Sequence, residues 1–490
     1  MLLWETLVLA AYGLCAGGLS LFGLHRLHLS QLFWRSWPQK PQAQDPVDWP
    51  KVTVQLPVFN ERAVVERLID AACALDYPGG KLEIQVLDDS TDDTTELAAG
   101  AVERWAAQGI DITLVHREDR TGYKAGALQK GLEQAKGSLI AVFDADFVPQ
   151  ASFLRDAVPH FQDGVGMVQA RWGHINETDS LLTKLQGMML DGHFVVEHTA
   201  RHRSGRWFNF NGTAGIWDRQ AIADAGGWQH DTLTEDLDLS YRAQLLGWRF
   251  VYLPDLVVPA ELPPTLRAFK SQQHRWAKGS IETMLKLGPR VLKADIPWRV
   301  KLEALVHLSN NLAYPMVVLL TLLTPIAVFV RGRQFNGWFV ADVFFFAAAT
   351  LGVAVFYASS QRAVYVDWRR RLWRLPAVMG LGIGMAVNQS RAVFEALTGQ
   401  QSPFVRTPKA GDEGALSYSI PAHWTAWIEV VLALYHLAGL VLAVSSGYWP
   451  SLPIQLLFCL GFGGVAFRTL RPAPTVAAAR RVALRGACRR

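Results

Sequence analysis

Four short motifs along this chain carry the side chains that could do chemistry. They are, in order, Asp88-Asp89, Asp144-Ala145-Asp146, Thr234-Glu235-Asp236 and Gln272-Gln273-His274-Arg275-Trp276. Carboxylate oxygens are the ligands that Mg²⁺ and Mn²⁺ use most readily in proteins, and a carboxylate can also take a proton from an attacking hydroxyl. One Asp-x-Asp pair alone is often only a turn that caps a helix. Because all four motifs occur together, we expect them to form one site.

The acidic motifs follow segments that read as buried strands. Strand patterns occur at 52–58, 83–87, 112–115 and 138–143, and helical patterns at 62–75, 92–107 and 124–135. Strands that alternate with helices predict a parallel sheet covered on both faces. Ligands of such sheets bind at the carboxyl ends of the strands. Asp88 and Asp144 follow two of these strands directly, so we expect their motifs to meet at one edge of the sheet.

Taken in order, the motifs resemble those of the processive family 2 glycosyltransferases, which include cellulose synthase and hyaluronan synthase. The resemblance is closest to the plant cellulose-synthase-like enzymes that make mannan and glucomannan, and it runs from roughly Val52 to Lys409. It implies a GT-A fold: an α/β, Rossmann-like cytosolic domain with a mostly parallel sheet, joined to an α-helical transmembrane region. The implied activity is an inverting transfer of hexose from UDP-glucose or GDP-mannose to a growing β-linked polysaccharide.

A nucleotide sugar carries a diphosphate that departs as an anion, so hard oxygen ligands holding Mg²⁺ or Mn²⁺ are expected beside it. Asp144 and Asp146 are spaced to place one carboxylate on the metal and the other near the sugar or ribose. Asp88 and Asp89 are expected at the base and ribose, and which of the two makes the contact is open. The segment around Lys124 resembles a Lys-Ala-Gly segment of the family, which implies that Lys124 meets the diphosphate at a helix start.

The third motif begins a helical pattern at 236–246. By resemblance, Asp236 is the base that takes the proton from the acceptor hydroxyl, with Glu235 beside it. The alternative is a capping box at the helix start, in which Thr234 and its acidic neighbours satisfy backbone groups. Both can hold, since a cap can also aim a catalytic carboxylate.

The fourth motif lies on an amphipathic stretch, 266–287, next to the apolar last third of the chain. The resemblance implies that Trp276 stacks on the acceptor sugar, with Gln272 beside it, and that Arg275 pairs with the diphosphate. The alternative is a membrane-surface helix with an interfacial Trp.

Two further segments are candidates for the acceptor path. Residues 208–217 mix aromatic side chains, amides and small residues, and Asn211, Gly212 and Thr213 are the expected acceptor contacts; core packing is the rival explanation for the aromatics. Residues 404–409 resemble the gating-loop motif of cellulose synthase, although Arg406 stands where that motif has Val.

Apolar runs long enough to cross a ~30 Å hydrocarbon core are predicted at five places. They are 2–24, 308–330, 338–358, 424–444 and 450–467. Segment 375–397 is ambiguous, because its second half is polar. The loop 361–374 holds five Arg against one Asp, and the tail 468–490 holds seven Arg and no acid. Both belong in the cytoplasm by the positive-inside rule, which requires that 375–397 lies at the interface instead of crossing.

Composition indicates which partners and which kinds of site the chain can have. Half of the residues are hydrophobic, 19% are charged and the net charge is +5. Much of the Arg lies beside apolar spans, which fits anionic lipid headgroups and not nucleic acid. Four scattered cysteines do not make a disulfide framework or a zinc site. The expected partners are a nucleotide-sugar donor, a glycan or lipid acceptor and membrane lipids.

The sequence therefore predicts a multi-pass integral membrane enzyme, expected in the plasma (inner) membrane with its catalytic domain in the cytoplasm. A rival prediction is a single-addition enzyme that glycosylates a lipid, as ceramide glucosyltransferases do, and a second is an inactive transporter or scaffold. The expected organisation is an anchor (1–25), a linker (26–50), the GT-A domain (51–265), interfacial helices (266–305), a channel region (306–467) that contains segment 375–397 and loop 398–423, and a basic tail (468–490).

Overall fold

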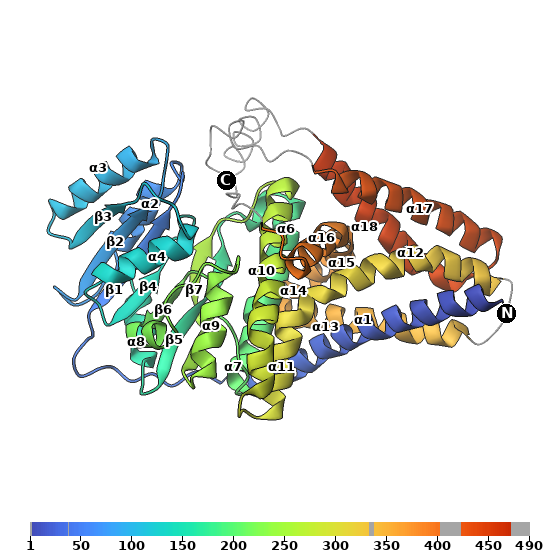
Figure 1. Ribbon diagram of the computed structural model, residues 1–490, viewed down its shortest axis with the longest axis horizontal. Coiled ribbons are helices and arrows are strands. Elements are labelled where there is room, and N and C mark those ends of the chain that lie inside the picture. The colour runs from blue at the N-terminus through green and yellow to red at the C-terminus, as the bar shows by residue number, and fades with distance from the viewer. Residues whose placement is uncertain (1, 38, 333–337, 402–422, 472–490) are drawn as a thin grey trace.

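The structure is a computed structural model that describes residues 2–37, 39–332, 338–401 and 423–471. Figure 1 shows a sheet covered by helices at one end of the molecule and a bundle of long helices at the other. Helix α10 (Leu266–Lys293) stands between the two regions. The predicted gating-loop segment, 404–409, and the basic tail from 472 onward lie outside the described residues.

The sheet confirms the predicted GT-A architecture. In the part of the chain that the structure describes, seven strands pair in the order β3-β2-β1-β4-β6-β5-β7. Their bounds are β1 (Val52–Val58), β2 (Leu82–Asp88), β3 (Ile112–His116), β4 (Leu139–Val142), β5 (Val165–His174), β6 (Gly215–Asp218) and β7 (Arg249–Ala260). The first four strands are parallel, while β6 runs antiparallel to both of its neighbours. The predicted strands match the first four to within one residue at each end.

Helices cover both faces of this sheet, as a parallel sheet of apolar strands requires. One core joins the sheet to α2 (Val65–Cys73) and α3 (Thr94–Ala106). The other joins it to α4 (Tyr123–Gln134), α8 (Arg219–Asp224) and α9 (Glu235–Leu245). The starts of α4 and α9 therefore lie near the same edge of the sheet, which is where two of the acidic motifs were expected.

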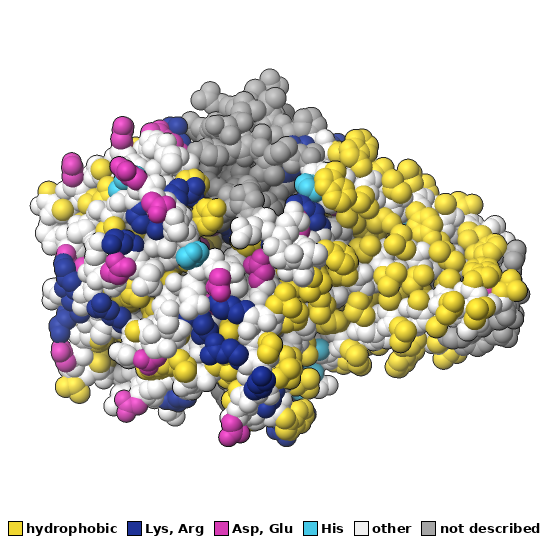
Figure 2. Space-filling view, in the orientation of Figure 1, with side chains coloured by type: hydrophobic (Ala, Val, Ile, Leu, Met, Phe, Trp, Pro, Cys, Tyr) yellow, Lys and Arg dark blue, Asp and Glu magenta, His cyan; other side chains and the backbone are white. Residues whose placement is uncertain are grey.

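Five helices among the described residues are long and apolar enough to cross a membrane. They are Leu3–Ser36 (α1), Trp298–Arg331 (α11, Trp298–Ser309, continuing through a 3₁₀ turn into α12, Ala313–Gly332), Val340–Val364 (within α13, Trp338–Val364), Thr425–Ser445 (α17) and Trp449–Leu470 (a 3₁₀ turn, then α18, Leu452–Leu470). Each contains most of one predicted span. Figure 2 shows that hydrophobic side chains cover this end of the molecule, whereas charged side chains gather over the sheet domain.

The ambiguous segment 375–397 is two short helices, α15 (Leu375–Gly384) and α16 (Ala386–Leu397), with a break at Met385. Neither alone has the roughly 20 residues that a crossing needs. The amide side chains of Asn388 and Gln389 donate to backbone carbonyls of α10, each at 3.0 Å. The polar half of the segment is therefore used to attach α16 to α10, and the location of the segment at the membrane surface stays a prediction.

Charge inside the long-helix bundle is neutralised by pairing. Arg331, near the end of α12, forms an ion pair with Asp342 of α13, and its guanidinium lies 4.5 Å from the ring centre of Tyr12 on α1. A charge placed among apolar helices is costly unless it is paired. This pair therefore offsets the cost of placing the Arg331 charge among apolar helices.

Candidate active site

A pocket of about 500 Å³ lies at the carboxyl ends of the strands, between the sheet and α10. Eleven of the predicted site residues line it. They are Asp89, Lys124, Asp144, Asp146, Asn211, Gly212, Glu235, Asp236, Gln272, Arg275 and Trp276. The residues come from β-strand ends, from the starts of α4 and α9, and from α10, so all four motifs meet in one place.

Asp88 and Thr213 do not reach this pocket. Asp88 is fully buried, and its carboxylate accepts hydrogen bonds from the Ser90 amide at 3.0 Å, the Thr95 hydroxyl at 2.7 Å and the His116 ring at 2.8 Å. Asp88 therefore holds the turn and its neighbour Asp89 faces the pocket, which favours Asp89; which of the two contacts the nucleotide stays a prediction. Two bonds from the Arg117 guanidinium, at 2.8 and 2.6 Å, fix the orientation of Asp89.

Thr213 has a supporting position in place of the predicted acceptor contact. It is fully buried, and its hydroxyl accepts a hydrogen bond of 2.8 Å from the backbone amide of Asp144. The adjacent strands β4 and β6 bring these two segments together. Thr213 therefore fixes the backbone from which the Asp144 carboxylate projects, and in this position its side chain does not line the pocket.

Lys124 is the cation at the centre of the acidic cluster. Its ammonium lies 2.5 Å from an Asp144 oxygen and 3.9 Å from a Glu235 oxygen. It also donates to the Gly212 carbonyl at 2.9 Å. Burial alone would lower the pKa of this ammonium, but the charges of Asp144 and Glu235 outweigh that effect and raise it. Lys124 thus remains charged and connects three segments that are distant in sequence.

Asp236 differs electrostatically from an ordinary aspartate. Burial raises the pKa of its carboxyl to about 7, the negative charge of Glu235 adds to the increase, and the charge of Lys124 opposes it. One carboxylate oxygen accepts from the backbone amide of Leu237 at 2.8 Å. The Thr234 side chain makes no capping hydrogen bond to the helix, so in this motif the contact with a backbone amide comes from Asp236.

Gly212 makes room for the Asp236 carboxylate. Its φ of +81° lies in the left-handed region, which glycine adopts without strain. A Cβ at this position would lie 3.2 Å from an Asp236 carboxylate oxygen and 3.4 Å from the Lys124 nitrogen. A side chain on residue 212 would therefore crowd both of these charged groups.

Helix α10 presents two opposite faces. Gln272, Arg275 and Trp276 have the i, i+3, i+4 spacing that places side chains on one face, and that face lines the pocket. The Trp276 ring centre lies 6.4 Å from that of Trp172 on β5. The capping of this helix by Thr265, which accepts from the Ala268 amide at 3.3 Å, sets where it begins.

The other face of α10 carries nitrogen-bearing side chains spaced by four residues. Lys270 lies 2.6 Å from Glu429 of α17, and Lys278 lies 3.8 Å from Glu395 of α16. His274, between them, lies 2.9 Å from Glu395; burial lowers the pKa of this ring, so it is a neutral hydrogen-bond partner. The lysine charges are buried, and breaking a buried pair by removing one partner typically costs about 3–5 kcal/mol. The orientation of the pocket-facing motif therefore depends on ion pairs to the long-helix region.

Sequence reasoning missed a cation–aromatic pair at the rim of the pocket. The Arg120 guanidinium lies 3.3 Å from the ring centre of Phe59, and both residues line the pocket. Phe59 follows β1 directly and precedes Asn60, which has a positive φ of 54°. A polar residue able to adopt that conformation right after a buried strand was the available signal for a turn at the functional edge of the sheet.

Comparison with known proteins identifies the domain. Residues 50–279 match the model of a family described as "Glycosyltransferase like family 2". These residues form a glycosyltransferase family 2 domain. The resemblance inferred from the motifs is therefore confirmed.

Two curated relatives of this family 2 domain carry the same kind of name. The chain is 44% identical over 280 residues to glucomannan 4-beta-mannosyltransferase 2 of Arabidopsis thaliana, a match that covers 54% of this chain and 52% of the relative. It is 46% identical over 246 residues to glucomannan 4-beta-mannosyltransferase 1 of Oryza sativa subsp. japonica, covering 49% and 47% respectively. The chain thus matches these curated relatives over about half of their length.

Among solved structures, the family 2 domain and its surroundings are similar to a mannosyltransferase from Pyrobaculum calidifontis, determined in complex with GDP-Man and Mn²⁺. The TM-score is 0.52 at 23% identity, and the match covers 80% of this chain and 100% of the other. At that identity the similarity shows a shared fold and nothing about the ligand of this chain.

The position of Lys124 generates a stability prediction. Lys124→Met removes the central cation and should cost about 2 kcal/mol, as expected for a hydrogen bond between charged groups. Because folding raises the pKa of Asp236 above its ordinary value of about 4, the contribution of this group to stability falls as the pH rises toward 7. Lys124 opposes that shift, so Lys124→Met should lower the free energy of unfolding more at pH 8 than at pH 5.

Thermal unfolding of the purified protein at the two pH values measures this. Lys130→Met is the matched control, because Lys130 lies on the same helix but is exposed and pairs with the exposed Glu133 at 2.9 Å. Equal losses from both substitutions, or a loss from Lys124→Met that does not depend on pH, would contradict the central role of Lys124.

Proposed function

We propose that this chain is an inverting, metal-dependent membrane glycosyltransferase that adds hexose from a nucleotide sugar to a growing β-linked polysaccharide. The observation that carries the proposal is the convergence of all four motifs in one pocket, beside helices long enough to cross a membrane. The names of the curated relatives favour mannose as the sugar and a β-1,4-linked mannan or glucomannan as the product. GDP-mannose is therefore the first donor to test, and UDP-glucose the second.

Asp144 and Asp146 are the residues proposed to hold Mg²⁺ or Mn²⁺. Among the described residues, no group of three or more His, Cys, Asp or Glu is arranged to hold a metal by protein side chains alone. Two carboxylates nevertheless fit a nucleotide-dependent site, because Mg²⁺ commonly takes one or two protein carboxylates and completes its ligands with substrate phosphates and water. When bound, such an ion neutralises negative charge that develops on the departing diphosphate.

Three further side chains are proposed to bind the donor. Lys124 and Arg275 project into the pocket from opposite sides, α4 and α10, and both are suited to a diphosphate because they donate charged hydrogen bonds. Asp89, which Arg117 holds in place, is proposed to accept a hydrogen bond from the nucleoside. Because Asp88 does not line the pocket, Asp89 is the better candidate for that contact.

Asp236 is the proposed catalytic base. The acceptor hydroxyl oxygen attacks the anomeric carbon from the side opposite the diphosphate while the bond from that carbon to the diphosphate breaks, which inverts the configuration. The proton of the hydroxyl passes to the Asp236 carboxylate. A pKa of about 7 makes this carboxylate a stronger base than an ordinary aspartate while leaving much of it deprotonated near neutral pH, which suits general-base catalysis.

Trp276, Gln272 and Asn211 are proposed to position the acceptor. An indole ring offers an apolar face to the C–H groups of a sugar, and the two amides offer hydrogen bonds to its hydroxyls. Gly212 contributes by the absence of a side chain next to Asp236. Glu235 is the second candidate for the base, because it shares the cluster around Lys124. The catalytic domain is proposed to face the cytoplasm of the plasma (inner) membrane.

The proposed activity is tested by supplying detergent-purified protein with labelled GDP-mannose, UDP-glucose and UDP-N-acetylglucosamine, and sizing the products. We expect incorporation from GDP-mannose into chains of many residues. A product of one sugar on a lipid would replace the polymerase proposal by the single-addition alternative. No turnover of any donor would reject transferase activity for this chain.

Asp236→Asn tests the base. The substitution keeps the shape of the side chain but removes its ability to accept the proton, so the rate of transfer should fall by roughly 10²–10⁴-fold. Affinity for the nucleotide sugar and the unfolding temperature should change little. In the native protein, the rate should rise with pH through about 7, because the base acts in its deprotonated form.

The comparison variant is Glu235→Gln, measured in the same assays. If Glu235→Gln abolishes transfer and Asp236→Asn transfers at the native rate, then Glu235 is the base. If the transfer rate of the native protein does not rise with pH near 7, the raised pKa of Asp236 plays no part in catalysis.

Chelation tests the metal. EDTA should stop turnover, and added Mg²⁺ or Mn²⁺ should restore it. Asp146→Ala should remove the metal-dependent part of nucleotide binding, measured by calorimetry with and without Mn²⁺, while the unfolding temperature without ligand stays near the native value. Full activity in EDTA would refute the assignment of Asp144 and Asp146.

A further inference from the structure

A helical rod behind the pocket contains a π-helical segment that no pattern in the sequence predicts. It consists of α6 (Leu181–Asp191), a π-helical segment η3 (Gly192–His198) and α7 (Thr199–Arg203), which follow one another without a break. Such π-helical turns are rare and frequently occur at functional sites. The polar side chains of this segment are His193, Glu197 and His198, and all three take part in the contacts described next.

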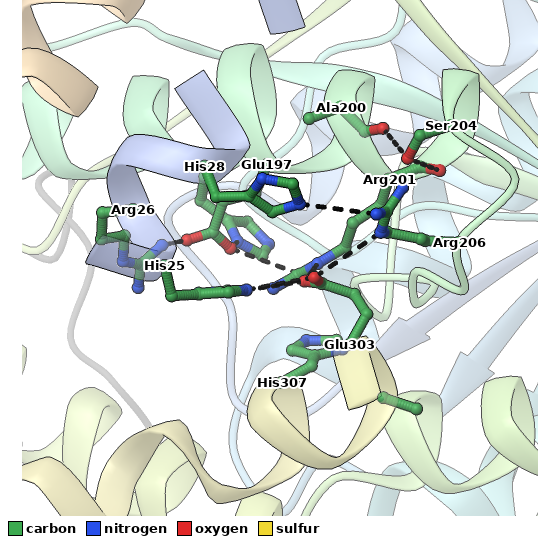
Figure 3. Close-up of polar contacts among 12 residues, drawn as sticks. His25, Arg26, His28, Glu197, Ala200, Arg201, Ser204, Arg206, Glu303 and His307 are labelled. Carbon is green, nitrogen blue, oxygen red and sulfur yellow. Dashed lines mark hydrogen bonds and ion pairs between the residues drawn. The ribbon is translucent and has the colours of Figure 1, made fainter. Parts of the chain in front are cut away.

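One side of the rod meets the N-terminal membrane helix. Arg26 of α1 pairs with Glu197 of the rod, and Arg201 lies 3.4 Å from the same carboxylate. Arg201 also lies 3.0 Å from Glu303 of α11, which His25 of α1 approaches to 3.1 Å. Figure 3 shows these side chains pointing toward one another from three separate elements.

Three of these residues are almost completely buried, while Arg26 keeps 22% of its side chain exposed. The exposed fractions are 5% for Glu197, 2% for Arg201 and 4% for Glu303. Buried charges are tolerated only when they are paired with good geometry. The carboxylate of Glu197 therefore has its position defined by cations on two sides, one of which belongs to the membrane helix.

The other side of the rod meets the pocket. His193 Nδ1 lies 3.0 Å from Glu197 Oε2, and His193 Nε2 lies 3.0 Å from the amide nitrogen of Asn211. The amide nitrogen can only donate, so Nε2 is the acceptor and Nδ1 carries the hydrogen that goes to Glu197. Burial and neighbouring cations hold the pKa of His193 well below its usual range, which agrees with this neutral form.

The amide of Asn211 is held at both of its ends. His198 Nε2 donates to the amide oxygen at 2.5 Å, while the amide nitrogen donates to His193. An amide has two N–H groups and two oxygen lone pairs, so one of each remains for a ligand in the pocket that Asn211 lines. The following residue, Gly212, provides the carbonyl that accepts from Lys124.

We propose that the N-terminal membrane helix forms a working part of the active site: Arg26, through Glu197 and His193, is a positioning residue that fixes the orientation of the Asn211 amide. The role of that amide as an acceptor contact rests on the proposed function. The rival explanation is that the cluster only stabilises the junction between the anchor and the domain. The two differ in whether the effect of Arg26 and His193 passes through Asn211.

A double-mutant cycle separates the two explanations. His193→Phe keeps a ring but loses both hydrogen bonds, and it should lower kcat for sugar transfer about tenfold, as expected from loss of one or two buried hydrogen bonds. The KM for the nucleotide sugar should change less than about twofold. His193→Gln should recover most of the rate, because its amide can accept from Asn211 and donate to Glu197.

In an Asn211→Ala background, His193→Phe should cause less than about a twofold further loss, because coupled residues are not additive. Arg26→Gln should behave in the same way. Arg35→Gln is the matched control, since Arg35 lies on the same helix and is exposed. A tenfold loss that persists in the Asn211→Ala background would support the purely structural explanation and overturn the proposal.

Hydrogen–deuterium exchange provides a measurement that needs no activity. In the purified, ligand-free protein, Arg26→Gln and His193→Phe should raise exchange in peptides that cover residues 207–214, and Arg35→Gln should not. Unchanged exchange in that segment overturns the proposal. If Arg26→Gln does not yield folded protein, the uncharged substitution His193→Phe decides. Failure of every donor in the transfer assay would reject the proposed function, while the exchange measurement would still decide this inference.

Discussion

The candidate site depends on one electrostatic constraint: negative groups from distant segments must be held together in a pocket without repelling one another. Asp144 follows a strand, and Glu235 and Asp236 begin a helix almost a hundred residues later in the chain. The ammonium of Lys124 lies between them, within 2.5 Å of Asp144 and 3.9 Å of Glu235. The loop before β6 also contacts Lys124, because its Gly212 carbonyl accepts a hydrogen bond from the same ammonium. These groups thus surround one partly buried cation, whose charge offsets their mutual repulsion.

The same rule governs how the sheet domain is attached to the long helices. One face of helix α10 lines the pocket, and lysines on the opposite face pair with Glu395 and Glu429. The rod behind the pocket is joined to α1 and α11 through Glu197 and Glu303. Buried ion pairs contribute little net stability compared with apolar packing, but each one penalises an arrangement that separates its partners. Such pairs therefore suit the junction between the sheet domain and the long helices, because the orientation of these two parts relative to each other affects the site.

Placing the pocket at this junction gives its two sides different chemistry. The strand ends and helix starts supply carboxylates and Lys124, which suit a nucleotide, whereas α10 supplies Trp276 and Gln272, which suit a sugar chain. The long apolar helices lie on the side of α10 away from the sheet domain. In the proposed reaction, Trp276 and Gln272 of α10 would contact the acceptor, while Arg275 of the same helix would bind the donor diphosphate.

Local patterns in the sequence were enough to predict the parallel strands, the helices that cover them and the five apolar helices, because strand and helix periodicity and apolar length are properties of neighbouring residues. These patterns also predicted that the motifs meet at one edge of the sheet. They did not separate Asp88 from Asp89, whose roles differ because one side chain turns toward Thr95 and His116 and the other toward Arg117. The sequence alone determined which residues could act. Only the tertiary structure decided the raised pKa of Asp236, the π-helical segment and the link from Arg26 to Asn211, because burial and ion pairing between residues far apart in the chain leave no periodic trace in it.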